Sequence, residues 1–165
     1  LGSLIALECA ASHSDRVRAI ALVGTTSPMP VSDAILNAAE ADDHAAFDML
    51  TQWGFSKRHQ FGGNRNSGIW MIGNTLRLYE RSGPGVLFHD MRACNEYVSG
   101  TDQASKVACP ALLILGAEDR LTPVRSTRAL QKAIPSPVVE VLPGAGHTIM
   151  VEAPNAMLDA LHKVL

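Results

Sequence analysis

The chain has 165 residues, 47% of them hydrophobic and 18% charged, and its formal net charge at pH 7 is -2. This composition is typical of about one globular domain and gives no sign of a disordered chain. The composition offers no basic surface for nucleic acid, so we do not expect nucleic acid as a partner. Its apolar runs are far shorter than the roughly 18 residues of a membrane span, so we do not expect a membrane partner either.

The first 31 residues predict a helix followed by a buried strand. The chain opens inside an aliphatic segment, without an initiator methionine, and this segment continues to about His13-Ser14-Asp15. Residues 17–24 then run almost without interruption through apolar side chains. Such a run is typical of a parallel strand that is covered on both faces.

Residues 32–99 have a different character, because they predict helices and no strand. Helical patterning covers residues 33–40, 43–53, 69–80 and 86–97. Ser32 is the expected N-cap of the first of these helices, and Asp42 or Asp43 that of the second. We interpret a glycine- and asparagine-rich break over residues 61–68 as a loop.

Residues 100–165 return to an alternation of strands and helices. The pattern predicts, in chain order, a strand over 111–115, a helix over 123–134, a strand over 138–142 and a final helix over 154–165. Pro123 and Pro154 fit the first turns of their helices, where the N–H that proline lacks would have no partner. The alternation favours a parallel sheet.

An acid and a base follow the two strands of this last zone. Asp119 comes just after the first strand, and His147 follows the second strand through Gly144-Ala145-Gly146. Ligands bind outside the carboxyl ends of the strands in an open α/β sheet, so we expect both side chains and residues 24–26 around one site. A carboxylate that faces an imidazole fixes its tautomer and stabilises its protonated form.

The polar residues near these strands also allow structural roles. Asp119 could instead be a helix N-cap or the first residue of an Asx turn, and Glu118 is a less favoured candidate acid. His44 and Asp48 lie four residues apart, a spacing that could hold a metal ion. Without a second histidine or a cysteine pair nearby, they fit better as part of a polar first helical turn. We therefore predict no metal ion and no cofactor.

The chain resembles the C-terminal portion of an α/β-hydrolase. Asp119 before His147 is the family's order for its acid and base, and Leu1-Gly2-Ser3 resembles the end of the G-x-S-x-G turn that carries the nucleophile. The resemblance implies an α/β fold with three parallel strands, flanking helices and an inserted helical cap. Its expected parts are a core over residues 1–31, the cap over 32–99 and a second core segment over 100–165.

The resemblance also implies a role for each site residue. Asp119 would orient His147, the general base, and the backbone N–H of Leu1 would form one half of an oxyanion hole. The nucleophile would lie one position before Leu1, in a missing N-terminal half of the same fold. The candidate substrate-binding residues are Met29, Trp53, Trp70 and Ile149. Apolar side chains in cap helices are, however, more often part of the packing.

These roles lead to an expected activity and to alternatives. The full-length protein is expected to be a serine esterase acting on a small-molecule substrate, an ester or related carbonyl compound. An Asp nucleophile would instead indicate a relative of haloalkane dehalogenases or epoxide hydrolases, but Leu1 and Gly2-Ser3 look more like the serine members. Without a nucleophile of its own, the 165-residue chain would do no chemistry and remain a structural fragment. Residues 17–23 would then be an aggregation-prone edge strand.

The cysteines bear on the cellular compartment. They are Cys9, Cys94 and Cys109, an odd number with no regular spacing. This usage favours reduced thiols, and we expect a cytoplasmic protein.

Overall fold

A three-stranded parallel sheet forms the centre of the computed structural model, which describes residues 1–64 and 68–164. Its strands are β1 (Ile20–Val23), β2 (Ala111–Gly116) and β3 (Val138–Leu142), arranged in the order β1-β2-β3. Ile20 pairs with Ala111, and Leu112 with Val138. Every residue of the central strand β2 is buried. The three predicted parallel strands are therefore confirmed, although β1 is shorter than the apolar run that predicts it.

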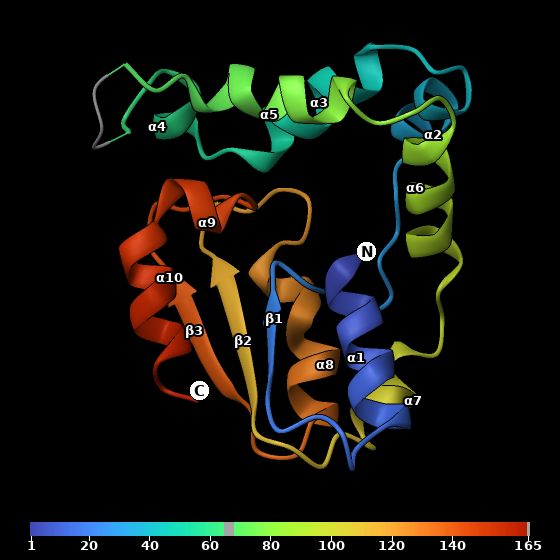
Figure 1. Cartoon of the computed structure of the whole chain (residues 1–165), viewed down its shortest axis with the longest axis vertical. Helices are drawn as coiled ribbons and strands as arrows, with labels where there is room; N and C mark the ends of the chain where they lie inside the picture. The colour runs from blue at the N-terminus through green and yellow to red at the C-terminus, as the bar shows by residue number, and fades with distance from the viewer. Residues whose placement is uncertain (65–67, 165) are drawn as a thin grey trace.

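Helices cover both faces of this sheet (Figure 1). On one face lie α1 (Gly2–Ser12), α7 (Gly100–Ala104) and α8 (Arg128–Ala133), and on the other lies α10 (Pro154–Leu161). Successive side chains of a strand point to opposite faces. Leu113 thus packs into the core with α1 and α8, and Leu112 into the core with α10. This double coverage explains why β2 is apolar without interruption.

The helices between β1 and β2, apart from α7, lie mainly beyond the carboxyl ends of the strands (Figure 1). They are α2 (Asp33–Glu40), α3 (Ala45–Gly54), α4 (Lys57–Gln60), α5 (Met71–Glu80) and α6 (Val86–Glu96). As predicted, the side chain of Ser32 caps α2, accepting from the N–H of Ile35 at 3.4 Å. Asp43 accepts from the N–H of Ala45 at 2.9 Å, whereas Asp42 bonds the N–H of Gly85. Asp43 is therefore the carboxylate that serves the start of α3.

Several elements differ from the sequence prediction. The helix expected over residues 123–134 is divided into a 3₁₀ turn, η1 (Val124–Thr127), and α8. The short helices α4, α7 and α9 (Ile149–Glu152) were not predicted, because four or five residues are too few to show a helical period. Part of the predicted loop, residues 65–67, and the predicted helix end at 165 lie outside the described residues. Among the described residues, no helix has the length and hydropathy needed to cross a membrane.

The side chain of His44 connects α3 with α5 on the surface. Its Nε2 lies 2.9 Å from Glu80 and its Nδ1 lies 3.2 Å from Asp48. These hydrogen bonds, that to Glu80 first, raise the pKa of His44 above its usual value. A histidine with a raised pKa in the folded state stabilises the fold fully below its unfolded pKa of about 6.5. This contribution disappears as the pH rises through the folded pKa.

We therefore expect the melting temperature of His44→Gln to fall below that of the unmodified chain mainly in acidic solution. The difference should be largest below about pH 6 and should shrink as the pH rises above about 6.5. Thermal melts followed by circular dichroism over this range measure it. His13→Gln, a change at another exposed histidine, serves as the matched control. A difference for His44→Gln that stays constant across the range would contradict the assignment.

Candidate active site

Asp119 and His147 meet at the carboxyl edge of the sheet. The Oδ2 atom of Asp119 lies 2.8 Å from Nδ1 of His147. Asp119 is in the turn after β2, and His147 is in the loop after β3, which pairs with β2 in parallel. Parallel neighbours end at the same edge of the sheet, so the two loops begin side by side. The structure thus brings together the acid and the base that the sequence predicts.

Backbone hydrogen bonds join these two loops independently of the Asp119 and His147 side chains. The N–H of Ala117 donates to the carbonyl of Leu142 at 3.0 Å, and the N–H of Glu118 donates to the carbonyl of Ala145 at 2.9 Å. Glu118 itself is exposed, whereas Asp119 is only 5% exposed. Asp119, rather than Glu118, is therefore the acid that faces the imidazole.

Asp119 uses its two carboxylate oxygens for different partners. Oδ1 accepts from the N–H groups of Leu121 and Thr122, both at 2.8 Å, which is an Asx-type turn. Oδ2 accepts from the Thr122 hydroxyl at 2.7 Å and contacts His147. The turn role that the sequence allows for Asp119 thus coexists with its role beside His147.

The protonation state of this pair follows from its surroundings. Burial by itself raises the pKa of Asp119, but the hydrogen bond and charge of His147, with the two bonds from Thr122, outweigh it and lower that pKa. The carboxylate is therefore ionised at neutral pH and can only accept hydrogen bonds. This assigns the proton of the imidazole to Nδ1 and leaves Nε2 as the basic nitrogen.

Gly24, at the end of β1, makes room for this pair. Its φ is +55°, and a Cβ atom built on it would lie 2.9 Å from both Cε1 and Nδ1 of His147 and 3.6 Å from Oδ2 of Asp119. A side chain at this position would push the imidazole away from Asp119. The residue that follows β1 thus contributes to the site because it has no side chain.

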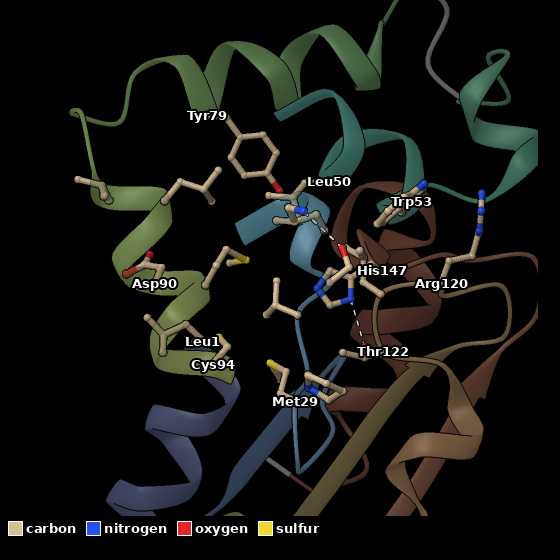
Figure 2. Close-up of a pocket in the computed structure, with 18 of the residues that line it drawn as sticks. Leu1, Met29, Leu50, Trp53, Tyr79, Asp90, Cys94, Arg120, Thr122 and His147 are labelled. Carbon is tan, nitrogen blue, oxygen red and sulfur yellow. Dashed lines mark hydrogen bonds between the residues drawn. The ribbon is translucent and has the colours of Figure 1, made fainter. Parts of the chain in front are cut away.

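The imidazole of His147 opens onto a cavity of about 400 Å³ (Figure 2). The cavity lies between the strand ends and the helices 32–99, and Leu1 at the start of α1 also lines it. Of the predicted substrate-binding residues, Met29 and Trp53 line it as well. Leu50, Tyr79 and other side chains complete a mainly apolar wall. This cavity is large enough for a small organic molecule.

Two of the predicted substrate-binding residues, Trp70 and Ile149, lie elsewhere. Trp70 is 67% exposed, and its ring packs against the backbone of Gly73, where any Cβ would collide with it. Ile149 is fully buried in the core beneath α10. Neither lines the cavity, because packing sets the direction of each side chain.

Thr122 belongs to the site although the sequence patterns did not single it out. Its hydroxyl contacts both Asp119 and His147. An aspartate that begins a turn or caps a helix accepts from the N–H groups two and three residues on, and this spacing could have identified Thr122. His44 and Asp48 lie in a surface network with Glu80. The described residues contain no cluster of three or more side chains suited to a metal ion.

Comparisons with known proteins agree with this architecture. The model of the alpha/beta hydrolase family matches residues 1–160. A pimeloyl-[acyl-carrier protein] methyl ester esterase from Chromobacterium violaceum is 31% identical over 171 residues, covering 98% of this chain and 65% of the relative. A putative carbamate hydrolase from Klebsiella pneumoniae is 28% identical, covering 92% of this chain and 58% of the relative. The chain thus spans about three-fifths of the length of these two relatives.

Solved structures with the same fold include two further hydrolases. A thermophilic esterase is 25% identical with a TM-score of 0.79, over 98% of this chain and 61% of that one. The enol-lactonase from Burkholderia xenovorans LB400 is 19% identical with a TM-score of 0.84, over 99% of this chain and 62% of that one. With the parallel sheet and the family match over residues 1–160 together, the chain belongs to the alpha/beta hydrolase family.

Proposed function

We propose that Asp119 and His147 are the acid and the base of a carboxylic ester hydrolase with a serine nucleophile. The observation that carries this proposal is the 2.8 Å contact between Oδ2 and Nδ1 at the mouth of an apolar cavity. It leaves Nε2 of His147 to take the proton of an attacking hydroxyl. The esterase and the putative carbamate hydrolase among the relatives support chemistry at an acyl carbon.

The start of α1 supports the placement of the nucleophile. Leu1 is the N-cap of this helix and lines the same cavity as His147 (Figure 2). We place the serine directly before Leu1, in a preceding segment that also supplies the rest of the sheet. The backbone N–H of Leu1 would then stabilise the oxyanion, aided by the positive end of the helix dipole.

The reaction proceeds in two halves. Nε2 of His147 removes the serine proton as the oxygen attacks the ester carbonyl, and Asp119 stabilises the resulting imidazolium. The imidazolium then protonates the departing alcohol, leaving an acyl-enzyme. Water, activated by His147, hydrolyses that ester and restores the serine. The apolar wall of Met29, Leu50 and Trp53 favours a small, hydrophobic ester as substrate.

The codons before Leu1 distinguish this chemistry from the principal alternative. Gly-x-Ser ending directly before Leu1 supports the esterase. Gly-x-Asp in that place would support displacement at an alkyl carbon, as in dehalogenases and epoxide hydrolases. Any other residue there would contradict the proposed nucleophile.

In the full-length protein, we expect His147→Ala to lower kcat for a p-nitrophenyl ester by about 10³- to 10⁴-fold, because the general base is lost. Asp119→Asn should have an effect of similar size, because the amide stabilises the wrong imidazole tautomer. Initial rates at saturating ester measure both. His13→Ala provides the control at an exposed histidine. Unchanged ester hydrolysis in His147→Ala would show that His147 is not the base.

Gly24→Ala should damage the site through shape alone. The added methyl group would displace the imidazole, and a shift of about 1 Å lowers kcat by about 100-fold. Gly85→Ala is the matched control, since Gly85 also has a positive φ of 74° but its added methyl would meet only ordinary contact with His89. Both variants carry the same kind of backbone strain. Equal loss of kcat in the two would refute a specific contact with His147.

A further inference from the structure

The carboxyl group of Glu152 in α9 is fully buried, and the proposed reaction does not use it. Its side chain has 0% exposure. Oε2 accepts from the N–H groups of Ser56 and Gly146, both at 3.0 Å, and contacts Nδ1 of His59 at 3.0 Å. Oε1 accepts from the Thr148 hydroxyl at 2.8 Å. A buried carboxylate with this many donors is fully satisfied.

The partners of Glu152 come from two parts of the chain. Ser56 and His59 belong to the junction of α3 with α4, within residues 32–99. Gly146 and Thr148 are the two neighbours of His147 in the chain. Glu152 therefore holds the loop that carries His147 against the α3–α4 junction, with one bond on each side of the base.

A direct contact reinforces the same junction. The N–H of His147 donates to the carbonyl of Gly54 at 2.6 Å, so the backbone of the base is itself bonded to the end of α3. Gly146 packs so closely that a Cβ atom on it would collide with Gly54, Ser56 and Glu152. The position of the imidazole thus depends on how the α3–α4 junction sits on this loop.

His59 is the side-chain partner of Glu152 inside the junction. It is 8% exposed, and its Nδ1 lies between the Ser56 hydroxyl at 2.8 Å and Oε2 of Glu152. Because a carboxylate only accepts, Nδ1 of His59 carries the proton that Oε2 receives. Removing Glu152 would leave this imidazole and two backbone N–H groups without their acceptor in a largely buried place.

We infer that Glu152 is a positioning residue for His147, acting by fixing the base loop to the α3–α4 junction. This inference rests on the proposed function, since it assigns the device to the same base. Glu152 does not line the cavity that His147 faces, and it acts through the backbone on both sides of His147. Its loss should therefore lower the rate of the chemical step more than it weakens substrate binding.

The test uses the full-length protein with Glu152→Ala and Glu152→Gln. For Glu152→Ala, we expect kcat for a p-nitrophenyl ester to fall by about 100-fold while KM changes by less than about threefold. Glu152→Gln should recover kcat to within about fivefold of the unmodified protein. Its amide oxygen can accept from Ser56 and Gly146, while the Thr148 hydroxyl can rotate to accept from the amide N–H.

A second readout follows the imidazole itself. The proton between Nδ1 of His147 and Asp119 gives a proton NMR signal that is assigned by its loss in His147→Ala. We expect the signal to be shifted or lost in Glu152→Ala and retained in Glu152→Gln. If the unmodified protein hydrolyses no ester, the proposed function fails, but this signal still tests the positioning role.

Two control variants separate positioning from general destabilisation. Glu140→Ala removes a carboxylate of β3 that pairs with Lys163 on the surface at 2.7 Å. Leu130→Ala opens a cavity in the core around α8, away from the site, and should lower the melting temperature without moving kcat or the NMR signal. Losses in Leu130→Ala equal to those in Glu152→Ala would overturn the inference. The inference would also be overturned if Glu152→Ala kept the kcat and the NMR signal of the unmodified protein.

Thr148→Val covers the case in which Glu152→Ala does not fold. This variant keeps the shape of the side chain and removes one donor to Glu152. We expect a severalfold lower kcat and a displaced imidazole signal. Values of the unmodified protein for both quantities would overturn the positioning role.

Discussion

The contact between Asp119 and His147 requires two loops to approach closely at one edge of the sheet, and much of the structure serves that approach. The parallel pairing of β2 with β3 starts both loops at the same edge. Backbone bonds from Ala117 and Glu118 then join the loops directly. Gly24 faces the imidazole, where a Cβ atom would lie only 2.9 Å from the ring. A 2.8 Å hydrogen bond between side chains 28 residues apart thus depends on main-chain geometry in all three strands.

The same contact sets the electrostatics of the site. Burial of Asp119 opposes its charge, yet its bonds to His147 and Thr122 hold its pKa below the usual range. The turn bonds at Oδ1 fix the carboxylate in place without using the oxygen that faces the imidazole. A fixed, ionised carboxylate requires no reorganisation when the imidazole gains a proton, which is how such a group lowers a barrier. The turn and the acid–base pair are therefore one structural solution rather than two competing ones.

The sequence predicts the features that depend on local pattern and chain order. Residues 111–115 and 138–142 are apolar runs of strand length, and an acid and a base after parallel strands must reach the same edge. Predictions that depend on side-chain direction did less well: Trp70 lies over its own helix and Ile149 in the core, although both were expected to line the site. The hydrogen bonds of Glu152 could not be predicted from the sequence for a related reason. Its bond to Ser56 joins residues 96 positions apart, and no local period records such a partner.

Hydrogen bonds join the helices of residues 32–99 to the core at several places, two of which are far apart. At one end, Glu152 and Gly54 join the α3–α4 junction to the loop of His147. At the other end, the Tyr97 hydroxyl donates to Glu8 of α1 at 2.7 Å, and burial together with this bond raises the pKa of Tyr97 to about 12. Tyr97 therefore stays protonated and keeps donating at any ordinary pH.

Between these two places, α6 contributes side chains such as Met91 to the wall of the cavity. A change at Met91 therefore acts on the wall of the cavity, whereas a change at the α3–α4 junction acts on the loop that carries His147.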